Sequence, residues 1–393
     1  MFAVFAPLRK IRQGGFALGF ATLLAACDHV ASGTVRGGPT INTAAPVPVA
    51  LLIPKGSEAS GDAVLAQSLE NAARLAVSDL QGVQIDLRVY DTKGAADTAA
   101  AQAVQAVNDG AKIILGPVRA EPANAAAVAV ANKNVNVLSF SNDSAVAGGN
   151  LYILGTTFQN TANRLARYAV AQGRTDIVVV HATDVAGQSG RNAIQTAVGG
   201  TQAQLVGTVP YGLSQHSVVA SVPVIRDQVL RSGANAIFLT STTAGALPLL
   251  TQLLSERGIR PPEIQYIGLA RWDIPVQTLE LQGVQGGWFA KPDPISAQEF
   301  RARYTVAYSS APQTITGLAY DGIAAIGALV GSGKSNALTG AALTQSAGFQ
   351  GATGIFRLRP DGTNERALAV ATIENKQVVV IDPAPNSFAN AGF

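Results

Sequence analysis

Short apolar runs alternate with segments of helical periodicity over most of the chain. In residues 61–80, apolar residues such as Leu65, Leu69 and Ala72 recur at spacings of three and four, which predicts an amphipathic helix. Residues 83–92 alternate apolar and polar positions and predict a half-buried strand. The strands expected up to residue 272 are 47–54, 83–92, 111–117, 135–143, 175–184, 202–211, 234–242 and 263–272. The helices expected with them are 61–80, 95–110, 120–134, 157–173, 187–200, 223–233 and 245–258.

This strand–helix alternation is typical of parallel sheets covered by helices on both faces. The pattern occurs in two successive blocks, so the sequence predicts an α/β fold with two doubly wound lobes. In such folds ligands bind beyond the carboxyl ends of the strands. The last part of the chain differs: a strand at 286–294 and helices at 295–310 and 314–331 precede antiparallel strands over 351–382, with Asp361-Gly362 as a hairpin turn.

The first residues resemble a bacterial lipoprotein signal. The basic cluster Arg9-Lys10-Ile11-Arg12 precedes an apolar run too short to span a bilayer, which leads to Leu24-Ala25-Ala26-Cys27. Cys27 is the sole cysteine, so lipidation is the role expected for it. We predict a signal peptide at 1–26, a flexible linker at 27–45 and a periplasmic protein, lipid-anchored to the cell membrane or the outer membrane. The alternatives are an ordinary signal peptide or a buried N-terminal helix.

Composition and motifs argue against several functions. Charged residues make up 13 % of the chain and the net charge is +3, with no basic run that would suggest nucleic-acid binding. Residues 330–336 read VGSGKSN, but Ala328 stands where a phosphate-binding P-loop needs its first glycine. The three histidines are scattered. We therefore expect no enzyme activity, no catalytic residue, no cofactor and no metal site.

Polar residues gather where the predicted strands end, which makes them candidates for a cleft. Hydroxyls at such positions commonly cap the following helix, and that is the alternative for each residue taken singly. Neutral donors with one aromatic side chain and a few charges suit a small polar ligand. The candidate ligand-binding residues are Ser57, Arg119, Ser139, Ser141, Asn142, Asp184, Thr240, Ser241, Trp272 and Asp273.

The order of elements, with KIILGPVRAEPANA (112–125), NVLSFSND (136–143) and LAYDGIAAI (318–326), resembles the leucine-binding branch of the type I periplasmic binding proteins over residues 46–383. The resemblance implies two lobes joined by three crossover segments, with no catalysis. The implied bounds are 46–155 and 286–340 for the first lobe, 156–285 and 341–383 for the second, and 384–393 for a tail.

Within this branch, GLARWD (268–273), LQGVQGGWFAKPDP (281–294) and the Ala-Tyr-Asp-Gly stretch at 319–322 look most like penicillin-binding-protein activators. That resemblance implies a lipoprotein that regulates peptidoglycan synthesis by binding a peptidoglycan synthase. The alternative is a substrate-binding protein of an ABC transporter, which would deliver an amino acid or another small polar ligand to a permease. In either case the membrane is reached through the lipid anchor alone.

The sequence departs from the amino-acid-binding pattern of the branch. Arg119 and Ala120 stand where a serine is expected to hold the ligand carboxylate, whereas Ser139 and Ser141 keep the second element. Ala186 replaces a tyrosine, and no glutamate is placed to hold the ammonium group, for which Asp273 is the candidate substitute. Losing a charged hydrogen-bond partner costs about 1.5–3 kcal/mol, roughly ten- to over a hundredfold in affinity.

Overall fold

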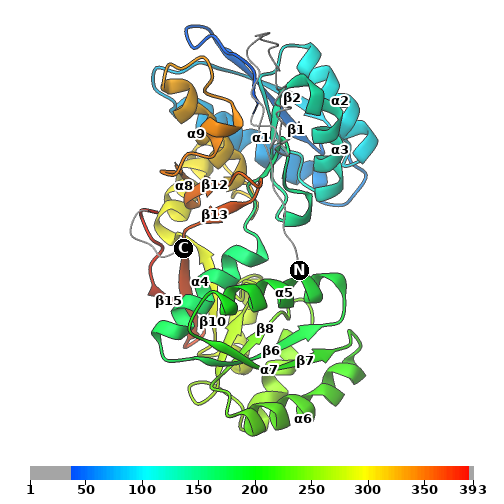
Figure 1. The fold of residues 1–393 in the computed structure, drawn as a ribbon, viewed down its shortest axis with the longest axis vertical. Helices are drawn as coiled ribbons and strands as arrows, with labels where there is room; N and C mark the ends of the chain where they lie inside the picture. The colour runs from blue at the N-terminus through cyan, green and yellow to red at the C-terminus, as the bar shows by residue number, and fades with distance from the viewer. Residues whose placement is uncertain (1–36, 389–393) are drawn as a thin grey trace, which may run out of the picture. The chain divides into compact units, whose positions relative to one another are not determined.

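The computed structural model describes residues 37–388 and places them in two α/β lobes, lobe 1 and lobe 2 (Figure 1). The lobe 1 sheet is parallel, in the order β2 (Ile85–Asp91), β1 (Val47–Ile53), β3 (Ile113–Leu115), β4 (Asn136–Ser139) and β5 (Leu151–Ile153). Its helices are α1 (Asp62–Asp79), α2 (Ala96–Asn108), α3 (Ala120–Val130), α8 (Pro294–Tyr308), α9 (Gly317–Gly331) and the short α10 (Gly340–Leu343).

Both faces of the lobe 1 sheet are buried, as expected for parallel strands. Along β1, Val49, Leu51 and Ile53 belong to a core that also holds α1 and α9. Between them, Ala50 and Leu52 point to the opposite face and pack with α2 and α3. Helices α1 and α9 lie side by side although they come from distant parts of the sequence (Figure 1).

Lobe 2 contains a larger, mixed sheet. Its order is β15 (Gln377–Asp382), β14 (Leu368–Glu374), β10 (Trp288–Pro292), β9 (Gln265–Gly268), β8 (Ala236–Leu239), β6 (Asp176–Ala182) and β7 (Gln204–Tyr211). Strands β6 to β10 are parallel, and β14 and β15 run antiparallel at one edge. Helices α6 (Gln215–Ser232) and α7 (Leu247–Glu256) cover one face, and α4 (Phe158–Ala171) and α5 (Val185–Gly199) cover the other. The predicted fold class of two doubly wound lobes is therefore confirmed.

The chain passes between the lobes three times, but two of the expected boundaries are wrong. Strand β10 pairs with β9 and β14, so residues 286–292 belong to lobe 2 rather than lobe 1. The strands β11 (Phe349–Gly351), β12 (Gly354–Leu358) and β13 (Asn364–Arg366) form a small sheet of their own. Their side chains Phe349 and Phe356 lie in the lobe 1 core, so this sheet belongs to lobe 1 rather than lobe 2. An apolar alternation does not specify which sheet a strand joins.

The first and third crossovers are hydrogen-bonded to each other. The Asn364 side-chain amide donates to the carbonyl oxygens of Ile153 at 2.7 Å and Gly155 at 2.9 Å. The Arg366 Nε donates to the Leu154 carbonyl at 2.6 Å, and the Asn160 amide donates to the Asn364 carbonyl at 2.9 Å. These buried polar bonds fix the position of the third crossover against the first.

Residues 37–45, the described part of the predicted linker, are packed against lobe 1 and do not form the flexible segment that their composition suggests. Ile41 is 5 % exposed and belongs to the lobe 1 core, and its N–H donates to the Ser335 carbonyl at 2.9 Å. The Gly38 carbonyl accepts from the Asn134 side chain at 2.9 Å. The part of the linker from residue 37 to residue 45 is therefore packed on lobe 1, and its glycines allow that close approach. Phe388 belongs to the predicted tail, and its ring centroid lies 4.7 Å from Cζ of Arg357, whose guanidinium stacks over it.

Candidate functional site

A hollow of about 370 Å³ lies at the carboxyl-terminal edge of the lobe 2 sheet. Residues that end or follow four neighbouring strands line it: Asp184 after β6, Tyr211 at the end of β7, Thr240 after β8 and Ala270 after β9. Its apolar walls include Phe158, Leu213, Val218 and Leu249. We call this feature the strand-end hollow. Its position is where doubly wound sheets bind ligands.

Hydroxyl groups and a single carboxylate supply the polarity of the strand-end hollow. Asp184 caps α5 by accepting the Gly187 N–H at 2.8 Å through Oδ1, and it is the one carboxylate among the described lining residues. Thr240 Oγ1 accepts the Ala182 N–H at 3.2 Å. Burial raises the pKa of Tyr211, while the Ser241 and Thr240 hydroxyls lower it to a smaller extent. The hollow thus combines an apolar body with a hydroxyl-rich floor and one negative charge.

The matching edge of lobe 1 holds an ion pair. Arg119 donates to Asp62 Oδ1 at 2.6 Å, and the Asp62 carboxylate is 6 % exposed. The Arg119 hydrogen bond holds the pKa of Asp62 below its usual range, against the raising effect of burial. Gly94 covers the pair, since a Cβ there would come within 3.1 Å of both Arg119 and Ser57. Arg119 therefore offers a partly neutralised guanidinium to a ligand.

The predicted serines after β4 hold their own loop. Ser139 Oγ donates to the Pro117 carbonyl at 2.9 Å and accepts the Ser141 N–H at 3.0 Å. Ser141 Oγ accepts the Asp143 N–H at 3.1 Å, and both serines are buried. Asn142, which follows Ser141, is exposed. Ser139 thus has a structural role, and the Ser141 hydroxyl keeps one donor to offer.

Trp272 is not a cleft residue, which corrects the prediction from sequence. Its side chain is 0 % exposed and lies in the lobe 2 core, stacked on Phe289 with ring centroids 6.5 Å apart. Gly268 and Gly287 make room for the indole, because a Cβ at either would come within 2.2 Å or 2.0 Å of it. A ligand cannot reach Trp272 without unpacking the lobe.

Asp273 is already matched by two cations. Arg271 donates to its two carboxylate oxygens at 2.8 and 2.6 Å, and Lys291 Nζ lies 3.2 Å from it. Burial alone would raise the pKa of Asp273, but Arg271 and then Lys291 lower it, and the net shift is downward. Asp273 lines a second hollow of about 600 Å³, together with Lys291, Phe300 and Arg301. Because its charge is matched, Asp273 is a poor substitute for the missing ammonium partner.

The structure brings the candidate residues together in groups. Asp184, Thr240 and Ser241 surround Tyr211 in lobe 2, whereas Ser57 and Arg119 meet around Asp62 in lobe 1. Sequence reasoning missed Tyr211 and Asp62. Tyr211 ends a predicted strand, and that position could have marked it as a cleft residue. Asp62 looked like an ordinary first-turn residue of a helix. Cys27 lies outside the described residues.

The strand-end geometry can be compared with known proteins. A family model described as periplasmic binding protein matches residues 46–377. The chain belongs to this family. No curated protein matches the chain by sequence. Family membership confirms the resemblance to the leucine-binding branch at the level of the fold and identifies a binding-protein scaffold.

Solved structures share the type I periplasmic-binding fold at low identity. A branched-chain amino acid ABC transporter periplasmic ligand-binding protein from Burkholderia xenovorans is 18 % identical, with a TM-score of 0.66 over 86 % of this chain and 96 % of that one. An ABC transporter substrate-binding protein from Desulfitobacterium hafniense in complex with Leu is 17 % identical, with a TM-score of 0.63 over 86 % and 100 %. A solute-binding protein from Rhodopseudomonas palustris in complex with 3,4-dihydroxybenzoic acid is 17 % identical, with a TM-score of 0.57 over 86 % and 96 %.

The described residues contain neither a candidate membrane-spanning helix nor a cluster of metal ligands. Between residues 37 and 388, no helix combines the length and the apolar character needed to cross a membrane. In the same part of the chain, no three His, Cys, Asp or Glu side chains come together as metal ligands.

Proposed function

We propose that this protein is the substrate-binding component of an ABC transporter and captures an amino acid or another small polar ligand in the periplasm. The observation that carries the proposal is the convergence of Asp184, Tyr211, Thr240 and Ala270, from four neighbouring strand ends, on one hollow. Solved proteins of this fold include one in complex with Leu and one in complex with 3,4-dihydroxybenzoic acid. Both kinds of ligand combine a polar end with an apolar body, as does the lining of the strand-end hollow.

The charges around the hollow suggest how a ligand would be oriented. Asp184 is the carboxylate available for an ammonium group or a hydroxyl donor, and its Oδ1 is held by the helix N-terminus. Arg119 on lobe 1 is the guanidinium available for a carboxylate, with Asp62 reducing its net charge. Domain closure about the crossovers would bring ligand groups to both edges.

Calorimetric titration with the standard amino acids and with aromatic and hydroxy acids tests the proposal. We expect saturable binding of at least one compound. Asp184→Asn keeps a capping side chain, so a ligand with an ammonium group should bind about tenfold or more weakly to that variant. Asp227→Asn is the matched control, because Asp227 is exposed on α6 and pairs with its neighbour Arg226. Equal binding by the parent protein, Asp184→Asn and Asp227→Asn would show that the ligand does not bind in the strand-end hollow.

The activator interpretation depends on motifs that have structural roles here. Trp288 packs edge-on against Tyr168 at 4.9 Å, Phe289 stacks on Trp272, and Asp321 pairs with Arg366. Because these motif residues are used in packing and ion pairing within the described structure, they do not favour a synthase surface. If the immobilised protein retains a peptidoglycan synthase and no compound of the panel binds, the activator function would be favoured over the transporter function.

We also propose that the protein is lipidated at Cys27 and held at a membrane of the cell envelope. The support is the sequence pattern of a basic cluster, an apolar run and Leu24-Ala25-Ala26 before the sole cysteine.

A further inference from the structure

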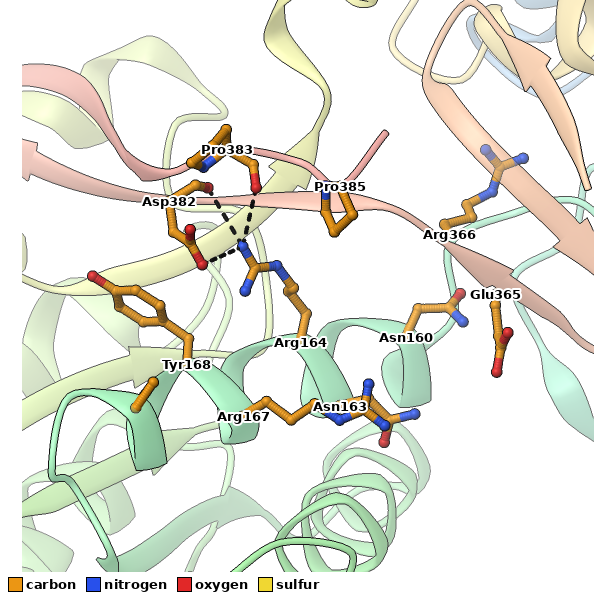
Figure 2. Close-up of a pocket in the computed structure, with 11 residues that line it drawn as sticks. Asn160, Asn163, Arg164, Arg167, Tyr168, Glu365, Arg366, Asp382, Pro383 and Pro385 are labelled. Atoms are coloured by element: carbon orange, nitrogen blue, oxygen red, sulfur yellow. Dashed lines mark hydrogen bonds and ion pairs between the residues drawn. The ribbon is translucent and has the colours of Figure 1, made fainter. Parts of the chain in front are cut away.

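A separate cavity of about 300 Å³ lies between helix α4 of lobe 2 and the strands β13 and β15 (Figure 2). Helix α4 contributes Asn163, Arg164, Arg167 and Tyr168, and the strands contribute Glu365 and Asp382. Since β13 leads into the third crossover, an occupant would touch both lobe 2 and the segment that joins the lobes. We call this feature the α4 cavity.

The carboxylates of the α4 cavity already have arginine partners. Arg164 donates to Asp382 at 2.6 Å (Figure 2). It also donates to the Leu368 carbonyl at 2.7 Å. Glu365 pairs with Arg357 and, at 3.0 Å, with Arg359, and its side chain is 8 % exposed. Neither carboxylate needs a further cation.

Arg167 has no such partner. Within residues 37–388, its guanidinium makes no hydrogen bond and has no carboxylate oxygen within ion-pair distance. Burial lowers the pKa of Arg167, the charge of Glu365 raises it, and the charge of Arg164 lowers it again. A half-buried guanidinium that donates to nothing is costly, because its five N–H groups are partly removed from water.

Two more donors lie beside Arg167. Asn163 is one helical turn before it, and its Oδ1 accepts from Gln159 Nε2 at 2.7 Å. The side-chain N–H groups of Asn163 make no hydrogen bond to another described residue. Figure 2 shows the Arg167 side chain running along α4 toward Asn163. The Tyr168 hydroxyl makes no hydrogen bond to another described residue. Ala171, Pro383 and Pro385 add apolar surface. The lining also includes Asn160, which donates to the Asn364 carbonyl, and Arg366, whose charge is matched by Asp321.

We propose that the α4 cavity binds a small organic carboxylate, with Arg167 and Asn163 donating to its oxygens. An arginine fork matches the two oxygens of a carboxylate. One unmatched positive charge favours a monoanion over a dianion. The Tyr168 ring and the two prolines provide an apolar surface for the carbon skeleton, which inorganic phosphate lacks. This site is separate from the strand-end hollow and does not depend on the ligand captured there.

The test is calorimetric titration of the full-length protein with acetate, butyrate, benzoate and inorganic phosphate. We expect saturable binding of butyrate or benzoate in the millimolar range or tighter, and about tenfold or greater weakening in Arg167→Gln. Arg226→Gln is the matched control, because Arg226 is exposed on α6, and this variant should bind like the parent protein. Unchanged thermal unfolding would show that Arg167→Gln is folded.

Three outcomes would overturn the proposal. They are the absence of saturable binding for every carboxylate, equal binding by the parent and Arg167→Gln, and Arg167-dependent binding of phosphate in preference to the organic acids. If Arg167→Gln does not fold, Asn163→Leu replaces it, and retention of full affinity by that variant counts against the site. ¹⁹F NMR of fluorobenzoate on the same variants gives a second readout.

Discussion

Arg366 on β13 and Asp321 on α9 form a salt bridge of 2.9 Å in which the side chains are 3 % and 0 % exposed. Thr353 also donates to Asp321, and Arg366 reaches the Leu154 carbonyl in the first crossover. The pair therefore connects lobe 1, the small three-stranded sheet and two of the crossovers. Breaking such a pair leaves an uncompensated charge in the interior.

Replacing Asp321 should be severely destabilising. In Asp321→Asn the Arg366 charge stays buried without its counter-ion, and we expect a loss of about 3–5 kcal/mol in the free energy of unfolding. Urea denaturation followed by circular dichroism measures it. Asp227→Asn breaks an exposed pair and should cost less than about 1 kcal/mol. Similar losses in the two variants would contradict the structural role of Asp321.

Asp273 should make stability depend on acidity. Its folded pKa is below the ordinary value of 3.8, because Arg271 and Lys291 outweigh burial. The unfolded chain then binds the proton more readily, so the stability from Asp273 is present above about pH 4 and is lost as pH falls through the lower folded pKa. Asp273→Asn should show a shallower loss of stability below pH 4 than the parent, measured by urea midpoints across the acid range. An unchanged acid profile would show that the carboxylate is not held by these cations.

Gly287 should not tolerate a side chain. A Cβ there would lie 2.0 Å from the Trp272 ring, so Gly287→Ala forces the core apart, and we expect a cost of about 1–3 kcal/mol. Gly199→Ala, at the end of α5, meets nothing within 4 Å and should be neutral or stabilising by up to about 1 kcal/mol. Thermal unfolding of the two variants side by side checks the contrast. If the variants are equally stable, Trp272 is not packed as described.

Cys27→Ser should detach the protein from the membrane. Without the thiol the chain cannot be acylated, so the variant is expected in the soluble periplasmic fraction or as an uncleaved precursor. Fractionation and intact-mass analysis of both proteins measure this. A variant that is still processed and membrane-bound would disprove lipidation at Cys27.

The local pattern along the chain was enough to predict the α/β architecture. Periodicities of two and of three to four residues placed most strands and helices, because burial on one or both faces leaves that signature. Helix α6 was the clearest local miss: it starts at Gln215, well before the 223–233 expected when Pro223 is taken as a start signal. The three-residue strand β5 is too short to show any periodicity.

The candidate site was harder to predict because it depends on contacts between distant residues. Asp62 and Arg119 lie 57 positions apart, and nothing near either one indicates that they pair. Trp272 follows a strand as a cleft residue would, yet it turns inward into space left by Gly268 and Gly287. Strand β10 joins lobe 2 through β14, which comes much later in the chain. These outcomes are set by packing that local sequence does not contain.

The three crossovers also determine when each lobe can fold as the chain is synthesised. Lobe 1 lacks α8, α9 and its small sheet until all of β6 to β10 has been made, and the lobe 2 sheet lacks β14 and β15 until the end. The lobe 1 core that contains α1 and α9 therefore cannot be completed until late in synthesis, whereas the core on the other face of the same sheet lies wholly within residues 50–151. Each lobe thus depends on a late segment of the chain for its final packing, which a pair of domains contiguous in sequence would not.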